Sequence, residues 1–257
     1  MRTRTYSDFL KYLDDEEIQM FKLDTIRKSI DYDGKTLNGI VETLVHKGFL
    51  CRLERGKYCR STFRDENVIG TFFVPDGVIS YWSALNLHGL TEQFPNTIFV
   101  QTTIKKNPVK VLGTSYQFIK IDIKKQTGIM HNGYGNYRYP ITDLEKTLVD
   151  CFDLPQYSGG YAELIRAFAQ TKPDAQKLIT YCKAVDNIAV IKRLALLCEL
   201  LGKEELNSFI DFAHTKVNRT YNLLDPLGNE KGETVSKWYL RLNISEEAIL
   251  KIAQNPY

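Results

Sequence analysis

Cysteine and histidine are scarce in this sequence of 257 residues, which contains five cysteines and four histidines. The cysteines are odd in number and no two of them stand in a C-x-x-C spacing, so neither a disulfide framework nor a zinc site is expected. We predict free thiols that pack as small apolar side chains in a reducing cytoplasm. A chain of this length can bury a core without disulfide or metal support.

Long apolar runs are also missing. The most apolar stretch, residues 68–91, is interrupted by Pro75-Asp76-Gly77 and contains His88. A membrane-spanning helix needs about 20 mostly apolar residues without such breaks. The N-terminus leads into a polar, acidic segment instead of the apolar core of a signal peptide. We therefore expect a cytoplasmic protein that does not interact with a membrane.

An excess of one charge is absent as well, because 34 lysine and arginine residues stand against 31 aspartate and glutamate residues, a formal net charge of +3. Any surface that binds nucleic acid must therefore be local. The sequence also contains no G-x-G-x-x-G, no Walker lysine after Gly159-Gly160 and no G-x-S-x-G. From these patterns we predict no cofactor, no metal and no catalytic residue.

Residues 1–62 have the pattern of three helices followed by a β-hairpin, which is the order of a winged helix-turn-helix. The first helix is expected over 6–13, and a short second helix is expected after a cap at Asp24. The third helix should begin at the cap Asp33 and end at Gly48. The apolar residues that define the three helices are Tyr6, Phe9, Leu10 and Leu13; Ile26 and Ile30; and Leu37, Ile40, Val41, Leu44 and Val45.

The hairpin is expected over residues 49–60. If Arg55-Gly56 forms its two-residue turn, Glu54 stands opposite Lys57 and Leu53 stands opposite Tyr58. This hairpin would be the wing, with a basic tip, and we predict that residues 1–62 form a separate domain.

In a winged helix-turn-helix the third helix enters the major groove of DNA and the wing reaches the backbone or the minor groove. Asparagine can read adenine, threonine can contact a base edge or a thymine methyl group, and cations neutralise phosphates. The predicted DNA-binding residues are Lys35, Thr36, Asn38 and Thr43 in the helix, Arg52, Arg55, Lys57 and Arg60 in the wing, and Arg2 and Arg4 in the leading arm. Winged helices also serve as protein-interaction modules, and this alternative stays open.

Residues 63–257 predict a larger mixed α/β domain that is mostly helical in its C-terminal half, so the chain as a whole belongs to the α+β class. A Thr142-Asp143-Leu144-Glu145 capping box should begin its first long helix. The other predicted elements are a helix over 81–90, with Trp82, Leu85 and Leu87 inward, strands over 97–103, 116–123 and 133–139, helices over 161–170, 173–183, 187–201 and 203–217, a strand over 235–244 and a helix over 245–254. The helix over 187–201 is the most apolar, and we expect it at the centre of the core.

Asp143, Lys146 and Asp150 stand at i, i+3 and i+7 on one face of that first long helix. Such a trio could bind a metal or transfer protons. The favoured interpretation is an exposed face with ion pairs along the helix. Glu145 is explained by the capping box, and His88 is expected to be a half-buried structural histidine.

Two segments of the second domain resemble the hallmark segments of the AbiEi-type antitoxins, a family also described as predicted transcriptional regulators of viral defence systems. The first segment is Ile79–Gln93, ISYWSALNLHGLTEQ, and the second is Ile141–Asp150, ITDLEKTLVD, followed by Pro155 and Gly159-Gly160. A weaker match is Trp238–Asn243. Together with the winged helix-turn-helix, the resemblance covers nearly the whole chain.

This resemblance implies a bacterial antitoxin of the type IV, abortive-infection class. The N-terminal domain would bind inverted repeats in the double-stranded promoter DNA of its own operon as two copies and repress transcription. The C-terminal domain would neutralise a nucleotidyltransferase-like toxin, which such antitoxins need not bind directly. The resemblance leaves Ser83, His88, Glu92, Asp143, Glu145, Lys146 and Asp150 as candidates for the antitoxin role. Two alternatives remain: an enzyme that modifies the toxin, for example by phosphoryl transfer, and an interaction module that sequesters it.

Overall fold

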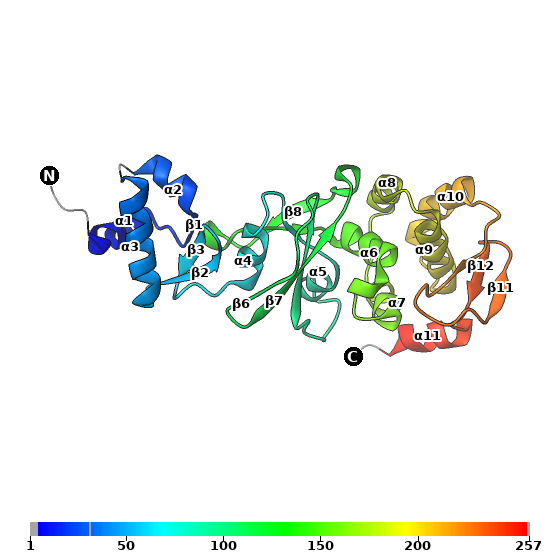
Figure 1. Cartoon of the computed structure of the whole chain (residues 1–257). Coiled ribbons are helices and arrows are strands. Elements are labelled where there is room, and N and C mark those ends of the chain that lie inside the picture. Colours follow the sequence, from blue (N-terminus) through cyan, green and yellow to red (C-terminus); the bar gives the residue numbers. More distant parts are fainter. Residues whose placement is uncertain (1–4, 31, 256–257) are drawn as a thin grey trace. The chain divides into compact units, whose positions relative to one another are not determined.

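The computed structural model describes residues 5–30 and 32–255, and it confirms the α+β class. The chain forms two compact units (Figure 1). The first unit runs to Ile69 and also takes in Gly133–Arg138, whereas the second contains Gly70–Asn132 and the chain from Tyr139 onward. The first unit thus continues past residue 62, the predicted boundary, and includes a segment from much later in the sequence.

The first unit is a winged helix-turn-helix with a three-stranded antiparallel sheet in the order β1-β3-β2. Its elements are α1 (Tyr6–Asp15), β1 (Met20–Lys22), α2 (Leu23–Ser29), α3 (Gly34–His46), β2 (Leu50–Glu54) and β3 (Lys57–Arg60). The strand β1 was not predicted. Because β1 leads directly into α2, Lys22 is the N-cap of that helix, and the predicted cap Asp24 lies within its first turn instead.

The core of this unit confirms the predicted helical faces except at Tyr6, which is exposed. Phe9 and Leu13 of α1 pack against the apolar face of α3, where Leu37, Val41 and Leu44 are fully buried. Apolar side chains at i, i+4 and i+7 share one face of a helix, so burying them leaves the opposite face of α3 to solvent.

The wing confirms one predicted pairing and corrects the other. Glu54 stands opposite Lys57, as expected for a turn at Arg55-Gly56. Leu53 does not stand opposite Tyr58, because an irregularity between Arg52 and Glu54 shifts the register and places Arg52 opposite Tyr58. The displaced Leu53 side chain is buried. A bulge adds one residue to a strand and bends it, which here lets an apolar side chain reach the core.

The second unit contains a six-stranded mixed sheet in the order β6-β7-β5-β4-β9-β8. Its elements are β4 (Val78–Ile79), α5 (Tyr81–Leu87), β5 (Thr97–Thr102), β6 (Val109–Val111), β7 (Thr114–Lys120), β8 (Ile129–Asn132) and β9 (Tyr139–Thr142), with α4 (Glu66–Phe72) at the junction of the units. The helix α4 was not predicted, and Leu87 at the end of α5 is exposed where an inward position was expected.

The predicted strand over 133–139 is wrong. β8 and β9 pair with each other on either side of this segment, which contains only a short 3-10 helix, Gly135–Tyr137. Gly133 and Gly135 both have positive φ, at 77° and 50°, a conformation that breaks an extended strand. Of the three tyrosines in this segment, Tyr134 and Tyr137 belong to the first unit, where the ring of Tyr137 stacks on Phe63, whereas Tyr139 begins β9 in the second unit.

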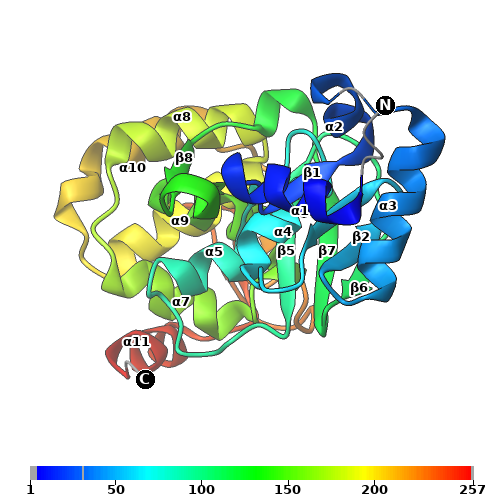
Figure 2. The same cartoon turned by 90° about the vertical axis from the view of Figure 1, so that its left-hand side faces the viewer.

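The rest of the second unit is mostly helical, and its helices lie beside the six-stranded sheet (Figure 2). They are α6 (Leu144–Asp153), α7 (Tyr161–Gln170), α8 (Ala175–Val185), α9 (Ile188–Leu200), α10 (Asn207–Lys216) and α11 (Glu246–Gln254). A small sheet contains β10 (Asn222–Leu223), β12 (Leu240–Leu242) and β11 (Glu233–Val235), in that order. The predicted strand over 235–244 therefore divides at a turn, where Tyr239 has a φ of 50°.

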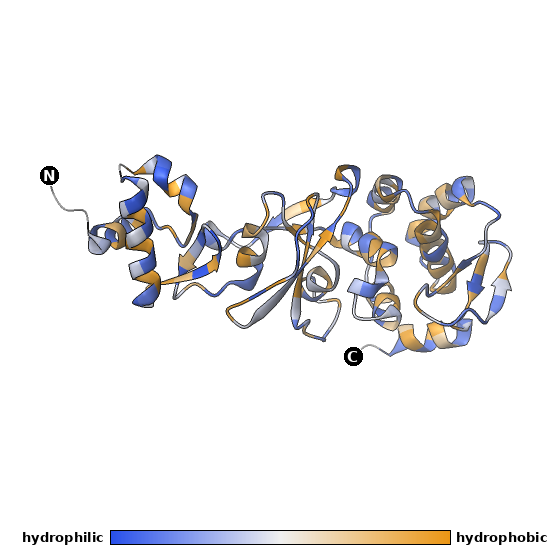
Figure 3. Ribbon diagram, viewed as in Figure 1, coloured by the Kyte–Doolittle hydropathy of each residue, from blue (hydrophilic) through white to orange (hydrophobic). Residues whose placement is uncertain are grey.

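Helix α9 is the buried centre of this unit, as its composition predicted. Leu194, Ala195 and Leu197 are fully buried, and the helix is strongly hydrophobic along its length (Figure 3). It contacts α6 and α10, so it joins the two halves of the helical region.

We expect Leu194→Ala to lower the free energy of unfolding of the second unit by about 2–5 kcal/mol, because the truncation leaves a cavity in a close-packed core. Both tryptophans of the chain, Trp82 and Trp238, lie in this unit, so their fluorescence during urea unfolding reports its stability. The control Leu227→Ala, at a side chain that is 57% exposed, should change the free energy by less than about 0.5 kcal/mol. Equal losses in both variants would contradict the central position of α9.

Candidate functional site

The exposed face of α3 carries all four predicted helix contacts. Lys35, Thr36, Asn38 and Thr43 are exposed and lie outside the stripe of buried residues that includes Leu37. Because their neighbours on the inner face are fixed by packing, these polar side chains stand on a rigid element and need no rearrangement to meet a ligand.

The first turn of α3 is held by its cap. The Asp33 carboxylate accepts hydrogen bonds from the backbone N–H groups of Lys35 and Thr36, both at 3.0 Å. Hydrogen bonds from Thr36 have the largest effect on the pKa of Asp33 and lower it, and the hydrogen bond from the Lys35 amide lowers it further. This carboxyl is therefore charged at neutral pH. In the middle of the helix, the Thr43 hydroxyl donates to the Gly39 carbonyl at 2.8 Å. Thr43 therefore offers its methyl group and an acceptor oxygen to a ligand.

The four predicted cations of the wing divide into two groups. Arg52 and Arg55 are exposed. Lys57 forms an ion pair with Glu54 at 2.8 Å, and its side chain is only 16% exposed. Arg60 forms an ion pair with Asp14 at the end of α1. Lys57 and Arg60 must leave these partners before they can bind a phosphate, so the wing presents fewer available cations than the sequence indicated.

Two cations of α2 were missed. Arg27 and Lys28 are exposed in the last turn of this helix. The guanidinium of Arg27 lies against the start of α3, where a Cβ added to Gly34 would be 3.3 Å from Arg27 Cζ. Their position in the helix that precedes α3 could have identified them. Arg2 and Arg4 lie outside the described residues.

The first group of candidates in the second unit has structural roles. The Ser83 hydroxyl accepts the Phe99 N–H at 2.9 Å, which anchors α5 to β5. The Nε2 atom of the half-buried His88 is 2.8 Å from the Thr142 carbonyl oxygen, as expected for a structural histidine. Glu92 is exposed in the loop after α5.

Asp143 and Glu145 join α6 to α8. The N-cap of α6 is Asp143, which accepts the Lys146 N–H at 2.9 Å, so the predicted capping box at Thr142 is wrong. Glu145 accepts the backbone N–H of Asp174 at 2.9 Å instead of capping its own helix. Lys177 of α8 donates to Asp143 and Glu145, both at 3.2 Å. These two hydrogen bonds raise the pKa of Lys177.

Lys146 and Asp150 form a buried ion pair, which corrects the interpretation of their helix face as exposed. The two side chains are 0% and 4% exposed, and Gln101 of β5 donates to the other Asp150 oxygen at 3.0 Å. Burial raises the pKa of Asp150, although the ammonium of Lys146 opposes this effect. Gly128 makes room for the lysine, since a Cβ there would be 2.6 Å from Lys146 Cβ.

The trio of Asp143, Lys146 and Asp150 is therefore not brought together at one open site. Asp143 interacts with Lys177, whereas Lys146 and Asp150 interact with each other in the core. A spacing of i, i+3 and i+7 predicts a common face but does not say whether that face meets solvent or another helix.

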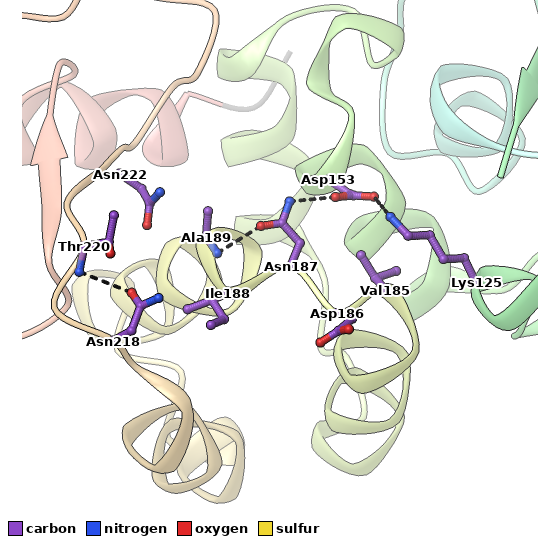
Figure 4. A pocket seen from close by; sticks show the side chains of 10 residues that line it. All are labelled: Lys125, Asp153, Val185, Asp186, Asn187, Ile188, Ala189, Asn218, Thr220 and Asn222. Atoms are coloured by element: carbon purple, nitrogen blue, oxygen red, sulfur yellow. Dashed lines mark hydrogen bonds and ion pairs between the residues drawn. The ribbon is translucent and has the colours of Figure 1, made fainter. Parts of the chain in front are cut away.

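A polar pocket that the sequence did not indicate lies at the start of α9 (Figure 4). Its side chains are largely bonded to one another: Asp153 accepts from Lys125 at 3.0 Å and from Asn187 at 2.7 Å. The pocket is lined by Lys125, Asp153, Val185, Asp186, Asn187, Ile188, Ala189, Asn218, Thr220 and Asn222. Within residues 5–30 and 32–255, no three side chains of His, Cys, Asp or Glu are grouped as metal ligands, and no helix is long and apolar enough to cross a membrane.

The buried pair gives a prediction about stability. Lys146→Met should lower the free energy of unfolding by about 3–5 kcal/mol, because it leaves the Asp150 carboxylate buried without its partner. The double variant Lys146→Met, Asp150→Leu should recover most of this loss, since no charge is then left in the core. Urea unfolding followed by tryptophan fluorescence measures both effects.

Lys177 provides the matched control, because its side chain is 50% exposed and forms an ion pair with Asp143, the N-cap of α6. Lys177→Met should cost less than about 1 kcal/mol. A Lys146→Met variant as stable as the Lys177→Met variant would show that the pair is not a structural element of the core.

No protein-family model matches this chain, and no curated protein does so. Among solved structures, the chain is similar to the crystal structure of the RV2827C protein from Mycobacterium tuberculosis, with a TM-score of 0.67 and 12% sequence identity. The match covers 98% of this chain and 96% of that chain. At this level of identity the likeness shows a common fold, which supports the α+β assignment and says nothing of function.

Proposed function

We propose that the first unit binds double-stranded DNA and that the protein is the repressor and antitoxin of a bacterial toxin–antitoxin operon. The observation that carries this proposal is the exposed polar surface of α3, together with the exposed arginines Arg52 and Arg55 of the wing, whose strand β2 contacts α3. An exposed helix flanked by cations at this position of a winged helix-turn-helix is the arrangement that reads the major groove.

In the proposed mechanism the first half of α3 enters the groove. Asn38 makes two hydrogen bonds to the edge of an adenine, and Thr36 contacts the neighbouring base. Arg52 and Arg55 of the wing neutralise phosphates. Arg27 of α2, whose guanidinium lies against the start of α3, joins them once it leaves Asp24, which is 3.8 Å away. The phosphate contacts supply affinity and orientation, whereas the two polar side chains of the helix supply the sequence preference.

The small number of available cations favours binding by two copies. Lys57 and Arg60 are held by Glu54 and Asp14, so each wing contributes two free arginines. Two copies on an inverted repeat double the number of phosphate contacts, and the salt-dependent affinity increases accordingly. This agrees with the autoregulation that the resemblance implies.

The antitoxin part of the proposal rests on the two segments that resemble the AbiEi-type family. They lie against each other in the second unit: Ile79 of β4 pairs with Ile141 of β9, and His88 bonds to the Thr142 carbonyl. Ser83, His88, Lys146 and Asp150 therefore act in the proposal as scaffold residues of the antitoxin domain. The target is a nucleotidyltransferase-like toxin in the cytoplasm, and the proposal assigns no catalytic step to this chain.

The promoter test is a titration of the full chain, by fluorescence anisotropy, with its own upstream DNA and with a scrambled duplex of equal length. We expect tighter binding to the promoter and affinity that falls as salt rises from 50 to 200 mM, because counterions are released from the phosphates. Equal and weak binding to both duplexes would overturn the DNA-binding proposal. Retention of the co-expressed toxin on the purified chain would then favour an interaction module.

Substitutions separate the two kinds of contact. Asn38→Ala should reduce the preference for the promoter over the scrambled duplex by about 1–3 kcal/mol. Arg55→Ala should weaken binding to both duplexes and lower the slope of log K against log salt by about one unit. Lys216→Ala, at an exposed lysine of α10, is the matched control and should change neither quantity. A slope that Arg55→Ala leaves unchanged would contradict the wing contact.

A further inference from the structure

The wing contains two cysteines that face each other across the hairpin. Cys51 of β2 and Cys59 of β3 are direct partners in the antiparallel register. Residues directly opposite in such a pair have Cα atoms about 4.5–5.5 Å apart and side chains on the same face of the sheet. A disulfide requires Cα atoms roughly 4.4–6.8 Å apart, so the backbone already meets this condition.

The two thiols lie at the same position along the hairpin. Their environments differ, because Cys59 is fully buried whereas Cys51 is half-buried at the sheet surface. Burial raises the pKa of the Cys59 thiol to about 12. An oxidant in solution therefore reacts with Cys51 first. Cys59 is then the neighbouring thiol that can attack the oxidised Cys51 and form a disulfide.

The other three cysteines differ from this pair in access. Cys151, Cys182 and Cys198 are fully buried in the core of the second unit, and burial raises the pKa of each thiol. Because oxidation follows thiolate character and exposure, these thiols should stay reduced when the wing reacts.

We propose that Cys51 and Cys59 are a disulfide-forming site through which a peroxide oxidant weakens DNA binding by the wing. The loss of DNA binding rests on the proposed function, whereas the disulfide itself does not. The closed ring would include residues 52–58, which contain both exposed arginines of the wing, Arg52 and Arg55.

The reaction balances with hydrogen peroxide as the oxidant. The Cys51 thiolate attacks one peroxide oxygen, the O–O bond breaks, and a sulfenic acid and hydroxide form; the hydroxide takes up a proton and becomes water. The Cys59 sulfur then attacks the sulfenic sulfur, the S–S bond forms, and a second water leaves with the Cys59 proton. The net reaction converts two thiols and one peroxide into a disulfide and two waters.

A disulfide changes the wing because it links the two strands covalently, with the sulfur atoms about 2.05 Å apart. The two side chains rotate to reach this distance, and the link then fixes the separation of β2 and β3 at Cys51 and Cys59. The bulge at Leu53, which stands between the bridge and the turn, is the point at which β2 can bend. The link restricts bending there, so Arg52 and Arg55 adjust less freely to the phosphates of the DNA.

The experiment treats the full-length reduced protein with hydrogen peroxide, removes the oxidant, unfolds the protein in the presence of N-ethylmaleimide to block the remaining thiols, and identifies linked peptides by mass spectrometry. We expect one intramolecular Cys51–Cys59 bridge and three blocked thiols. The oxidised protein should bind promoter DNA more weakly, with a salt slope lower by about one to two units, and dithiothreitol should restore both values.

Cys51→Ser is the main control, because Cys51 is only half-buried and the substitution leaves the core intact. Its DNA binding should be insensitive to peroxide, and Cys59→Ala should behave alike. Absence of the linked peptide, bridges between chains, or a bridge that leaves DNA affinity unchanged would each overturn the proposal. A reduced protein that does not bind DNA would refute the proposed function instead, and the peptide analysis would still decide whether the bridge forms.

Discussion

Burial of one face of α3 is the constraint on which the proposed DNA interface depends. Leu37, Val41 and Leu44 are fully buried against α1 and the small sheet, so the rotation of α3 about its axis is set by the core. Only after this rotation is fixed do Thr36 and Asn38 stand exposed, one on each flank of the buried face. Truncating an inner leucine would therefore alter recognition as well as stability, although no inner side chain could touch DNA.

The fold of the first unit was predictable where it depends on local signals. The cap at Asp33 and the periodic apolar residues of α3 are encoded within a few turns of one helix, and the Arg55-Gly56 turn is a two-residue pattern. The strand β1 was not predictable in this way, since a strand of three residues has too short a pattern. The register shift at Leu53 also escaped, because it depends on whether that side chain can reach a core formed by distant segments.

Long-range contacts explain the other failures. The segment 133–138 has the aromatic content of a strand, but Asn136 donates to the Glu17 carbonyl at 2.7 Å and Tyr137 stacks on Phe63, so partners more than 70 residues away decide its conformation. Likewise, Lys146 and Asp150 have the spacing of a surface ion pair. Whether such a pair is exposed depends on the helix that covers it, and the pairing of charges alone does not reveal this.

Two cations of α9 also show that exposure depends on distant segments, because here charged residues are buried within an apolar helix. This helix is apolar enough for its central position to be predicted, yet Lys192 and Arg193 are buried within it. Arg193 donates to the Leu223 carbonyl at 3.1 Å, and Lys192 donates to Asn222 at 3.0 Å. Their donors are thus met by oxygens of the C-terminal segment and, for Arg193, also by the Phe152 carbonyl, instead of carboxylates. A buried cation needs enough acceptors of any kind, so these two residues fix the small sheet to the core and are not evidence of a catalytic site.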